Sequence, residues 1–437
     1  MALAAGPAKR SQRAVNNKWG VRMQFDISLF AIIGFILAAY AVVGNDALQT
    51  LGTFINSNRR LPWWALFLFA ATILVVVFFY GYITDGGELR NADGSVKTLC
   101  DFSVGCDTSY GRLDNTDKYP IFDPKWYHTL PPLMLLVLTR FGIPVSTTFM
   151  VLTIFATMAG LSSMLQKSLI GYGLAFVVGL AIYLALSRTL EGFFRRTEHQ
   201  QHAPIWVLLQ WLTTAYLWAV WLMQDFANIF IFLPRGDGVT PGSGLNPAEA
   251  IAAVGVTILL LGYTFWNNGG PVQRILQSKT SVTDIRSATI IDFTYASLLF
   301  YFKELNDVPM STTWVFLGLI AGREYAFAVT TRAISFMRTA RVTMSDVSKA
   351  FIGLVISVDM ARGLPWLAQG FEGEGVFRAP ALAELAPTPS FAWFLIIINL
   401  MLLPVAAYLA RNTVLRMSIL FGVYVVAAAA FMIMPIA

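Results

Sequence analysis

Two short stretches with the pattern Pro-x-Ser-Thr-Thr carry the clearest candidate chemistry in this chain. They occupy residues 144–148 and 309–313, and each lies inside a long apolar run. Each follows an apolar segment and opens another, which is typical of the tip of a helical hairpin. The first turn of a helix has free backbone N–H groups and a positive dipole end, and Ser and Thr add hydroxyl donors. Each stretch therefore predicts a helix start that can bind an anion.

A cluster with the pattern amide–Asp–x–x–amide precedes each stretch. The two clusters are Asn45-Asp46-x-x-Gln49 and Gln224-Asp225-x-x-Asn228. The three-residue spacing places the acid and the second amide on one helix face. An amide in an apolar helix either joins helices or binds a ligand, and both alternatives stay open. An aspartate in the middle of a span must be paired, protonated or cation-bound. We therefore expect Na⁺ or H⁺ at Asp46 and Asp225, because hard cations prefer such oxygen ligands.

Two further charged residues are candidates. Arg140 lies just before the first Pro-x-Ser-Thr-Thr stretch, where it either makes a bidentate contact to an oxyanion or extends towards the membrane surface. Asp292 lies alone in the arm that leads to the second stretch. It is either another cation or proton site, or a partner that caps Arg286.

The composition indicates a membrane protein. Of the 437 residues, 56% are hydrophobic and only 13% are charged, and the mean hydropathy is +0.62. Soluble domains are far more polar, and several apolar runs are long enough to cross a bilayer as helices. The net charge of +6 comes from basic residues scattered between apolar runs. It therefore reflects loop asymmetry and does not indicate nucleic-acid binding.

The apolar pattern predicts an all-α polytopic membrane protein with about eight full spans and two re-entrant hairpins, about twelve helical elements in all. The runs at 25–57 and 204–234 are too long for one uninterrupted span, and each has its polar cluster inside. The other predicted spans are 62–84, 168–190, 248–266, 350–361, 391–409 and 414–434, and the hairpins are 130–166 and 288–328.

The charges of the loops predict the topology. With the N-terminus outside, the basic loops at 59–60, 188–203, 268–286 and 330–349 fall inside. The acidic loops at 85–130 and 362–389 then fall outside, and only the basic tail disagrees. The two halves become an inverted repeat, the architecture of many secondary transporters. The predicted division is a tail at 1–24, a first repeat at 25–203, a second repeat at 204–361 and a C-terminal part at 362–437.

The few cysteines and histidines bear on whether the chain has a disulfide, and whether it is an enzyme or a haem protein. Cys100 and Cys106 share one loop, where they form either a disulfide or two free thiols. The three histidines, His128, His199 and His202, all lie in predicted loops. The sequence has no metal-ligand spacing and no nucleophile–base pair, so we expect neither an enzyme nor a haem protein.

These motifs resemble the inorganic phosphate transporter (PiT) family of cation-coupled phosphate symporters. That family carries two Gly-Ala-Asn-Asp-Val-Ala-Asn-type motifs and two hairpins that read Pro-Val-Ser-Thr-Thr-His. Arg140 fits a basic position common before the first tip, and Asp292 lies where the family tends to have Glu. The residues that match the motifs are Gly44, Asn45, Asp46, Asp225, Ala227, Asn228, 144–148, 309, and 311–313. The chain also departs from these motifs: Gln49 and Gln224 replace asparagines, Phe149 and Trp314 replace histidines, and the Val-Ala pairs become Ala47-Leu48 and Phe226-Ala227.

The resemblance implies a Na⁺- or H⁺-coupled symporter of inorganic phosphate in the cytoplasmic (inner) membrane, without any other cofactor. It implies cations at Asp46 and Asp225, while Asp292 stays the further candidate. Homodimers are common for such folds. The alternatives are another oxyanion such as sulfate, or a transport-inactive sensor or scaffold subunit. The residues expected to bind the anion are Ser146, Thr147, Thr148, Ser311, Thr312, Thr313, Asn45, Gln49, Gln224, Asn228 and Arg140.

Overall fold

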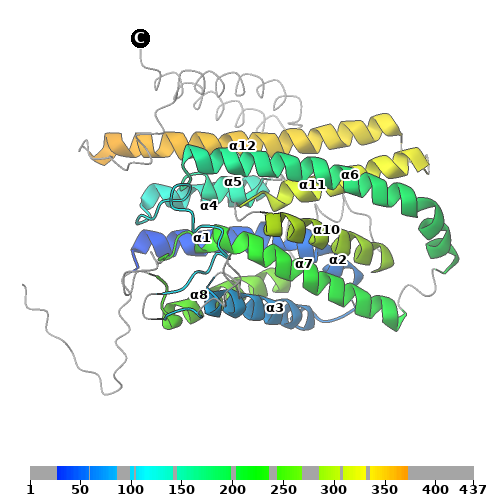
Figure 1. Cartoon of the computed structure of the whole chain (residues 1–437), viewed down its shortest axis with the longest axis horizontal. Helices are drawn as coiled ribbons and strands as arrows, with labels where there is room; N and C mark the ends of the chain where they lie inside the picture. The colour runs from blue at the N-terminus through cyan, green and yellow to red at the C-terminus, as the bar shows by residue number, and fades with distance from the viewer. Residues whose placement is uncertain are drawn as a thin grey trace, which may run out of the picture.

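The structure of the chain is a computed structural model, and Figure 1 shows its arrangement. It describes residues 27–58, 60–85, 99–102, 105–140, 145–197, 203–235, 244–267, 285–305, 309–330 and 335–372. The predicted basic tail at 1–24 and the predicted spans at 391–409 and 414–434 lie outside the described residues.

The described part of the chain is a bundle of helices that lie side by side along one axis (Figure 1). It contains a single isolated β-bridge, Cys106 to Leu245, and otherwise only helices, turns and loops. The helices are α1 (Leu29–Asn45), α2 (Ala47–Ser57), α3 (Trp63–Ile83), α4 (Leu130–Arg140), α5 (Thr147–Leu152), α6 (Met158–Arg196), α7 (Pro204–Phe230), α8 (Pro247–Trp266), α10 (Ile285–Leu305), α11 (Thr312–Thr330) and α12 (Phe336–Glu372), with the 3-10 turn η1 (Trp126–Thr129) before α4.

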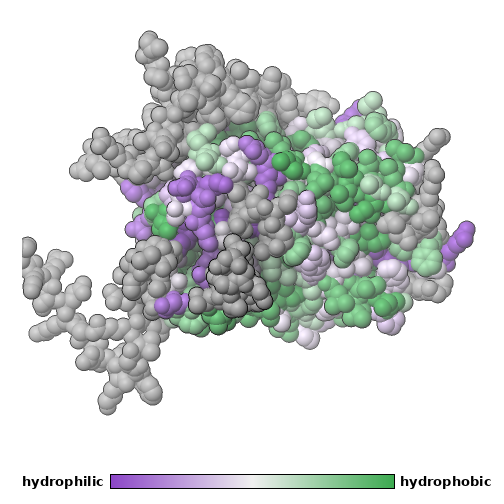
Figure 2. All heavy atoms as spheres, in the orientation of Figure 1, coloured by the Kyte–Doolittle hydropathy of each residue, from purple (hydrophilic) through white to green (hydrophobic). Residues whose placement is uncertain are grey.

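Several of these helices can cross a membrane. Among the described residues, α3, the segment Met158–Ala185 of α6, α7 and α8 are long and apolar enough, and the bent pair α1–α2 makes a fifth. Figure 2 shows hydrophobic residues over much of one half of the visible face, while hydrophilic residues gather towards the opposite end. The all-helical membrane class is therefore confirmed for the described part of the chain.

The two long apolar runs fold differently. The first breaks at Asp46, and α1 and the segment Thr50–Ser57 meet at a bend of 51°. The second forms α7 without interruption through Asp225, so the predicted break there is wrong. Gly44 and Asn45 are poor helix formers before Asp46, whereas Asp225 follows Gln224, which favours the helix. The neighbouring residues thus decide whether an aspartate breaks the helix.

The helix that follows the first Pro-x-Ser-Thr-Thr stretch is shorter than the predicted returning arm. This helix, α5, ends before a short turn that leads into α6. Residues 158–166, predicted as part of the returning arm, belong to the 39-residue helix α6 instead. Lys167 and Ser168 resembled a boundary, but both are buried inside this helix. Tertiary contacts bury these polar residues, and the sequence pattern alone therefore did not predict a continuous helix.

The last described helix also corrects a prediction. Residues 336–349 and 362–372, predicted as parts of a basic and an acidic loop, are both helical in α12. Ser335 directly precedes the helix, and its carbonyl oxygen accepts from the backbone N–H groups of Arg338 (2.9 Å) and Thr339 (3.0 Å). Arg338 and Arg341 lie on its exposed side, and basic residues suit an exposed helix face as well as a loop. The predicted span 350–361 lies inside this helix.

Helices α6 and α11 lie in close contact through small residues. A Cβ atom at Gly318 would collide with the carbonyl oxygen of Tyr172, and one at Gly179 would lie 2.7 Å from that of Leu319. A Cβ atom at Gly322 would collide with the Phe176 carbonyl oxygen. Small residues let membrane helices approach this closely, so that dispersion contacts hold the pair together. The pair fixes the start of α11, which is the second Ser-Thr-Thr tip.

The loops gather at the two ends of the bundle. At one end, named here the outer end after the predicted topology, the described residues 99–102 and 105–129, called the outer loop, lie against residues 153–157, 231–235 and 244–246. Thr157 Oγ1 donates to the Asp117 carbonyl oxygen (2.8 Å), and Arg235 donates to that of Pro120 (2.7 Å). At the inner end, Asn58 Nδ2 donates to Gln210 Oε1 (2.9 Å), and Arg286 donates to the Phe194 carbonyl oxygen (2.9 Å).

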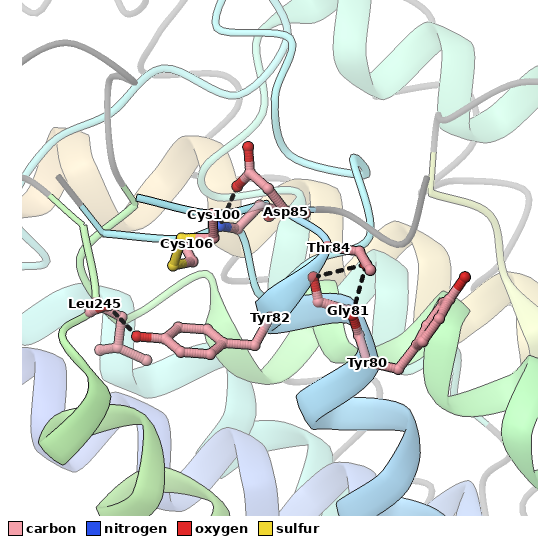
Figure 3. Close-up of a disulfide and its surroundings, with 9 residues drawn as sticks. Tyr80, Gly81, Tyr82, Thr84, Asp85, Cys100, Cys106 and Leu245 are labelled. Atoms are coloured by element: carbon pink, nitrogen blue, oxygen red, sulfur yellow. Dashed lines mark hydrogen bonds between the residues drawn. A yellow bond between two sulfur atoms is a disulfide. The ribbon is translucent and has the colours of Figure 1, made fainter. Parts of the chain in front are cut away.

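The outer loop contains a disulfide between Cys100 and Cys106, so the disulfide alternative holds (Figure 3). The Cys100 backbone N–H donates to the Ile83 carbonyl oxygen (2.9 Å), which joins the bridge to the end of α3. Tyr82, one residue earlier, donates to the Leu245 carbonyl oxygen (2.8 Å). Disulfides persist in oxidising compartments, which is consistent with the predicted outer placement of this loop.

His128 gives the outer end a pH-sensitive stability. It is buried in η1, its Nδ1 accepts from the Lys125 backbone N–H (2.9 Å), and burial lowers its pKa to about 3. Below about pH 6.5 this histidine is protonated in the unfolded chain, whereas it stays neutral in the folded chain. The free energy of unfolding therefore falls as the pH drops from about 6.5 towards 3, by about 1 kcal/mol per pH unit. We expect the wild-type melting temperature to fall more between pH 7.5 and 5.5 than that of His128→Gln. Equal slopes for the two proteins would contradict this explanation.

Candidate functional site

The two Pro-x-Ser-Thr-Thr stretches begin helices, as their sequence predicts. Ser146 is the N-cap of α5, and its side chain accepts from the Phe149 backbone N–H (3.2 Å). Ser311 plays the same part before α11 and accepts from the Trp314 backbone N–H (3.2 Å). The serines and the two threonines that follow each of them are buried. Each tip thus turns backbone and hydroxyl groups towards the interior of the bundle.

The two tips meet directly. The Thr148 hydroxyl donates to the Met310 carbonyl oxygen (3.1 Å). The Phe149 and Trp314 rings, one residue after each tip, meet edge to face with centroids 6.4 Å apart. The Ser311 backbone N–H donates to Ser168 Oγ (2.9 Å), which fixes the second tip to α6. Segments far apart in the sequence therefore form one buried centre.

Each aspartate contacts the tip of its own half. Asp46, at the bend between α1 and α2, accepts hydrogen bonds from Asn45 Nδ2 (2.6 Å) and from the Thr147 hydroxyl. The Thr312 hydroxyl lies against the Asp225 carboxyl group on α7. Thr147 and Thr312 hold the same place in their Ser-Thr-Thr sets. The two carboxyl groups also lie close enough to interact electrostatically, so both clusters belong to the same centre.

Two of the amides, Asn45 and Asn228, join the aspartates to the first tip, and a third, Gln224, bonds to α10. Asn45 Nδ2 also donates to the Val145 carbonyl oxygen (3.3 Å). Asn228 Nδ2 donates to Asp225 Oδ1 and to Thr148 Oγ1 (3.3 Å). Gln224 Nε2 donates to the Leu299 carbonyl oxygen (3.0 Å). The structure therefore gives these amides a connecting role, and it leaves some of their oxygens for a ligand.

Three buried oxygens on α7 have no hydrogen-bond donor of standard geometry among the described residues: Gln224 Oε1, Asp225 Oδ2 and Asn228 Oδ1. Buried acceptors without a donor are rare, and each calls for a partner. One carboxylate and two amide oxygens on adjacent helix positions are ligands that a hard cation such as Na⁺ prefers. The donor set at Asp225 therefore fits a cation.

Asp292 lies at a junction of three helices. The Thr53 hydroxyl on α2 donates to its Oδ1, and the Thr214 hydroxyl on α7 donates to its Oδ2, both at 2.9 Å. Arg286 donates instead to Thr197 and to the Phe194 carbonyl oxygen at the inner end. These hydrogen bonds of the two residues differ from the predicted alternative in which Asp292 caps Arg286.

Two predicted site residues have side chains that the structure does not describe, and two residues near the site were not predicted. The side chains of Gln49 and Arg140 lie outside the described residues. Tyr295 was not predicted. Its hydroxyl donates to the Thr312 carbonyl oxygen (3.0 Å), and it interacts electrostatically with both central aspartates. Its place three residues after Asp292, on the same helix face, is a signal that could have found it. Arg112 was also missed, because nothing in the outer-loop sequence marks it.

No protein-family model matches the chain, and no curated protein matches it. One solved structure, titled "The sodium-dependent phosphate transporter", is similar with a TM-score of 0.48 and 14% sequence identity. The match covers 78% of this chain and 98% of that chain.

Proposed function

We propose that this chain is a cation-coupled transporter of inorganic phosphate in the cytoplasmic membrane, with Na⁺ or H⁺ as the coupling ion. One observation carries the proposal. Two Ser-capped helix starts meet in the buried centre, and the equivalent threonine of each contacts the aspartate of its own half: Thr147 with Asp46 and Thr312 with Asp225.

In this proposal the two tips bind the anion and the aspartates bind the coupling cations. The N–H groups and hydroxyls of both tips bind the phosphate oxygens, because helix starts favour negative charge. Asp46 and Asp225 hold the coupling cations, which neutralise the carboxylates and allow an anion to bind beside them. Three oxygens on α7 that have no donor of standard geometry among the described residues support a cation at Asp225. Asp292 is a further cation or proton site, since its hydroxyl partners stabilise a charged carboxylate.

The proposed transport mechanism is alternating access by two inverted halves of the chain. We assign residues 25–203 and 204–361 to two inverted halves, each with one hairpin, and place the anion between the hairpin tips. One hairpin opens towards the outer side while the other closes the inner side, and the two then exchange roles. The phosphate and its cation thus cross together.

The direct test is uptake into sealed proteoliposomes. We expect labelled phosphate to accumulate when a Na⁺ or H⁺ gradient is imposed and to equilibrate without one. Uptake of labelled sulfate is measured in parallel. Uptake of sulfate without uptake of phosphate would identify the substrate as another oxyanion. Binding without uptake under either gradient would assign the chain to a sensor or scaffold instead. The absence of both binding and uptake would refute the proposal.

The tip serines are tested by Ser311→Ala. Ser311 is the cap of α11 at the anion site, so its loss weakens the helix start and removes one hydroxyl group. We expect the apparent affinity for phosphate to fall about tenfold, the size of a lost hydrogen bond to a charged group. Ser297→Ala is the matched control, because its exposed hydroxyl donates only within α10. Equal affinities for the two variants would remove Ser311 from the binding site.

A further inference from the structure

Arg112 is a fully buried cation that the proposed function has not used. It lies in the outer loop, yet only 1% of its surface is exposed, and it is among the largest fully buried side chains of the described residues. Burying a guanidinium is costly unless an opposite charge or an acceptor faces it. The charged groups near this side chain therefore bear on its role.

A tight turn directs this arginine inward. The Asp107 carboxylate accepts from the backbone N–H groups of Ser109 (2.8 Å) and Gly111 (2.8 Å). Tyr110 and Gly111 both have positive φ angles, 56° and 72°, so the chain reverses sharply before Arg112. The disulfide precedes this turn, and Arg235 donates to the carbonyl oxygen of Leu113 (3.2 Å) just after it. The disulfide and the Arg235 hydrogen bond thus fix the chain before and after the turn.

The turn is inserted against α7 beside the central site. The Tyr110 ring stacks on Phe226 with centroids 6.3 Å apart, and the Tyr110 hydroxyl donates to the Val77 carbonyl oxygen on α3. Phe226 follows Asp225 directly, and Arg112 acts electrostatically on the Asp225 carboxyl group. The outer loop therefore brings a positive charge to the site that holds two aspartates.

We infer that Arg112 is an anion-binding residue of the central site and that the outer loop supplies it. A phosphate between the tips faces the negative charges of Asp46 and Asp225, and a guanidinium that interacts with Asp225 offsets part of that repulsion. Arginine stays charged at every physiological pH and its planar donors match tetrahedral oxyanions. This inference rests on the proposed function, and it adds a binding group that belongs to neither hairpin.

The experiment measures equilibrium binding of labelled phosphate and labelled sulfate to purified full-length protein. The variants are Arg112→Gln, which removes the charge, and Arg112→Lys, which keeps it without the planar donors. Lys118→Gln is the matched control, since it removes one positive charge from the same loop. We expect Arg112→Gln to weaken binding about 10- to 100-fold, as the loss of a charge-assisted hydrogen bond does. Arg112→Lys is expected to be intermediate, and Lys118→Gln to stay within about twofold of the wild type.

A second pair of variants separates anion contact from mere neutralisation of Asp225. In an Asp225→Asn background, Arg112→Gln still weakens binding if the guanidinium contacts the anion, and has no further effect if it only neutralises Asp225. The latter result would overturn the inference, as would wild-type affinity in Arg112→Gln itself.

Folding and the parent proposal are checked in the same experiment. The intact Cys100–Cys106 bridge, counted as absence of free thiols, shows that each variant keeps the outer loop. If Arg112→Gln loses the bridge, Arg112→Lys alone decides: weaker binding supports the inference, and unchanged binding overturns it. A wild-type protein that binds neither anion would instead overturn the proposed function, and this inference with it.

Discussion

Asp46→Asn is expected to abolish cation-driven phosphate uptake while the protein still folds. Asp46 accepts from Asn45 and Thr147 at the bend between α1 and α2, so its carboxylate joins the cation site to the first tip. The amide keeps the size of the side chain but removes its charge. Loss of one buried charge partner typically amounts to 3–5 kcal/mol, which corresponds to a fall of about 100-fold or more in cation affinity.

The measurement is uptake of labelled phosphate under separate Na⁺ and H⁺ gradients, with binding at fixed cation concentration as a second readout. Asp123→Asn is the matched control, because Asp123 is exposed in the outer loop. We expect this control to transport like the wild type. Gradient-driven uptake by Asp46→Asn at the wild-type rate would show that Asp46 holds no coupling cation.

Gly322→Ala is expected to destabilise the protein strongly, although it adds a single methyl group. A Cβ atom there would collide with the Phe176 carbonyl oxygen and lie 2.7 Å from the Leu180 backbone nitrogen, both in α6. Backbone atoms of a packed helix cannot move aside singly, so α6 and α11 must separate. We expect a loss of about 2–3 kcal/mol or more, seen as a lower melting temperature and less monodisperse protein.

Gly173→Ala is the matched control in the same helix pair. Within the described part of the chain, no atom beyond its chain neighbours and its own helix backbone lies within 4 Å of a Cβ atom at Gly173. The added methyl group meets open space and restricts the unfolded chain, so we expect a small gain of about 0.5–1 kcal/mol. The two alanine variants should therefore change the melting temperature in opposite directions. A lower value for both, by the same amount, would show that close contact of α6 and α11 is not the cause.

The sequence predicts local features of the site well, because their causes are local. Ser146 and Ser311 cap helices through N–H groups three residues away, so the Pro-x-Ser-Thr-Thr pattern is sufficient to find both helix starts. The apolar runs show the membrane class for the same reason. The break at Asp46 follows from Gly44 and Asn45 beside it.

The same reasoning fails where distant parts of the chain decide the outcome. Nothing near Lys167 shows that α6 continues through it, because tertiary contacts bury this polar residue. Asp292 has partners on two other helices, Thr53 and Thr214, which are remote in sequence.

Arg112 shows the division most clearly. From the sequence it is one arginine in an acidic outer loop, and charge alone predicts a solvated side chain. The turn at Asp107 and the stacking of Tyr110 on Phe226 bury it beside Asp225. The sequence by itself thus determined the membrane class, the two hydroxyl-capped helix starts and the two aspartate clusters. The tertiary structure decided that they share one centre and that Arg112 joins it, because burial and long-range contacts depend on which segments meet in space.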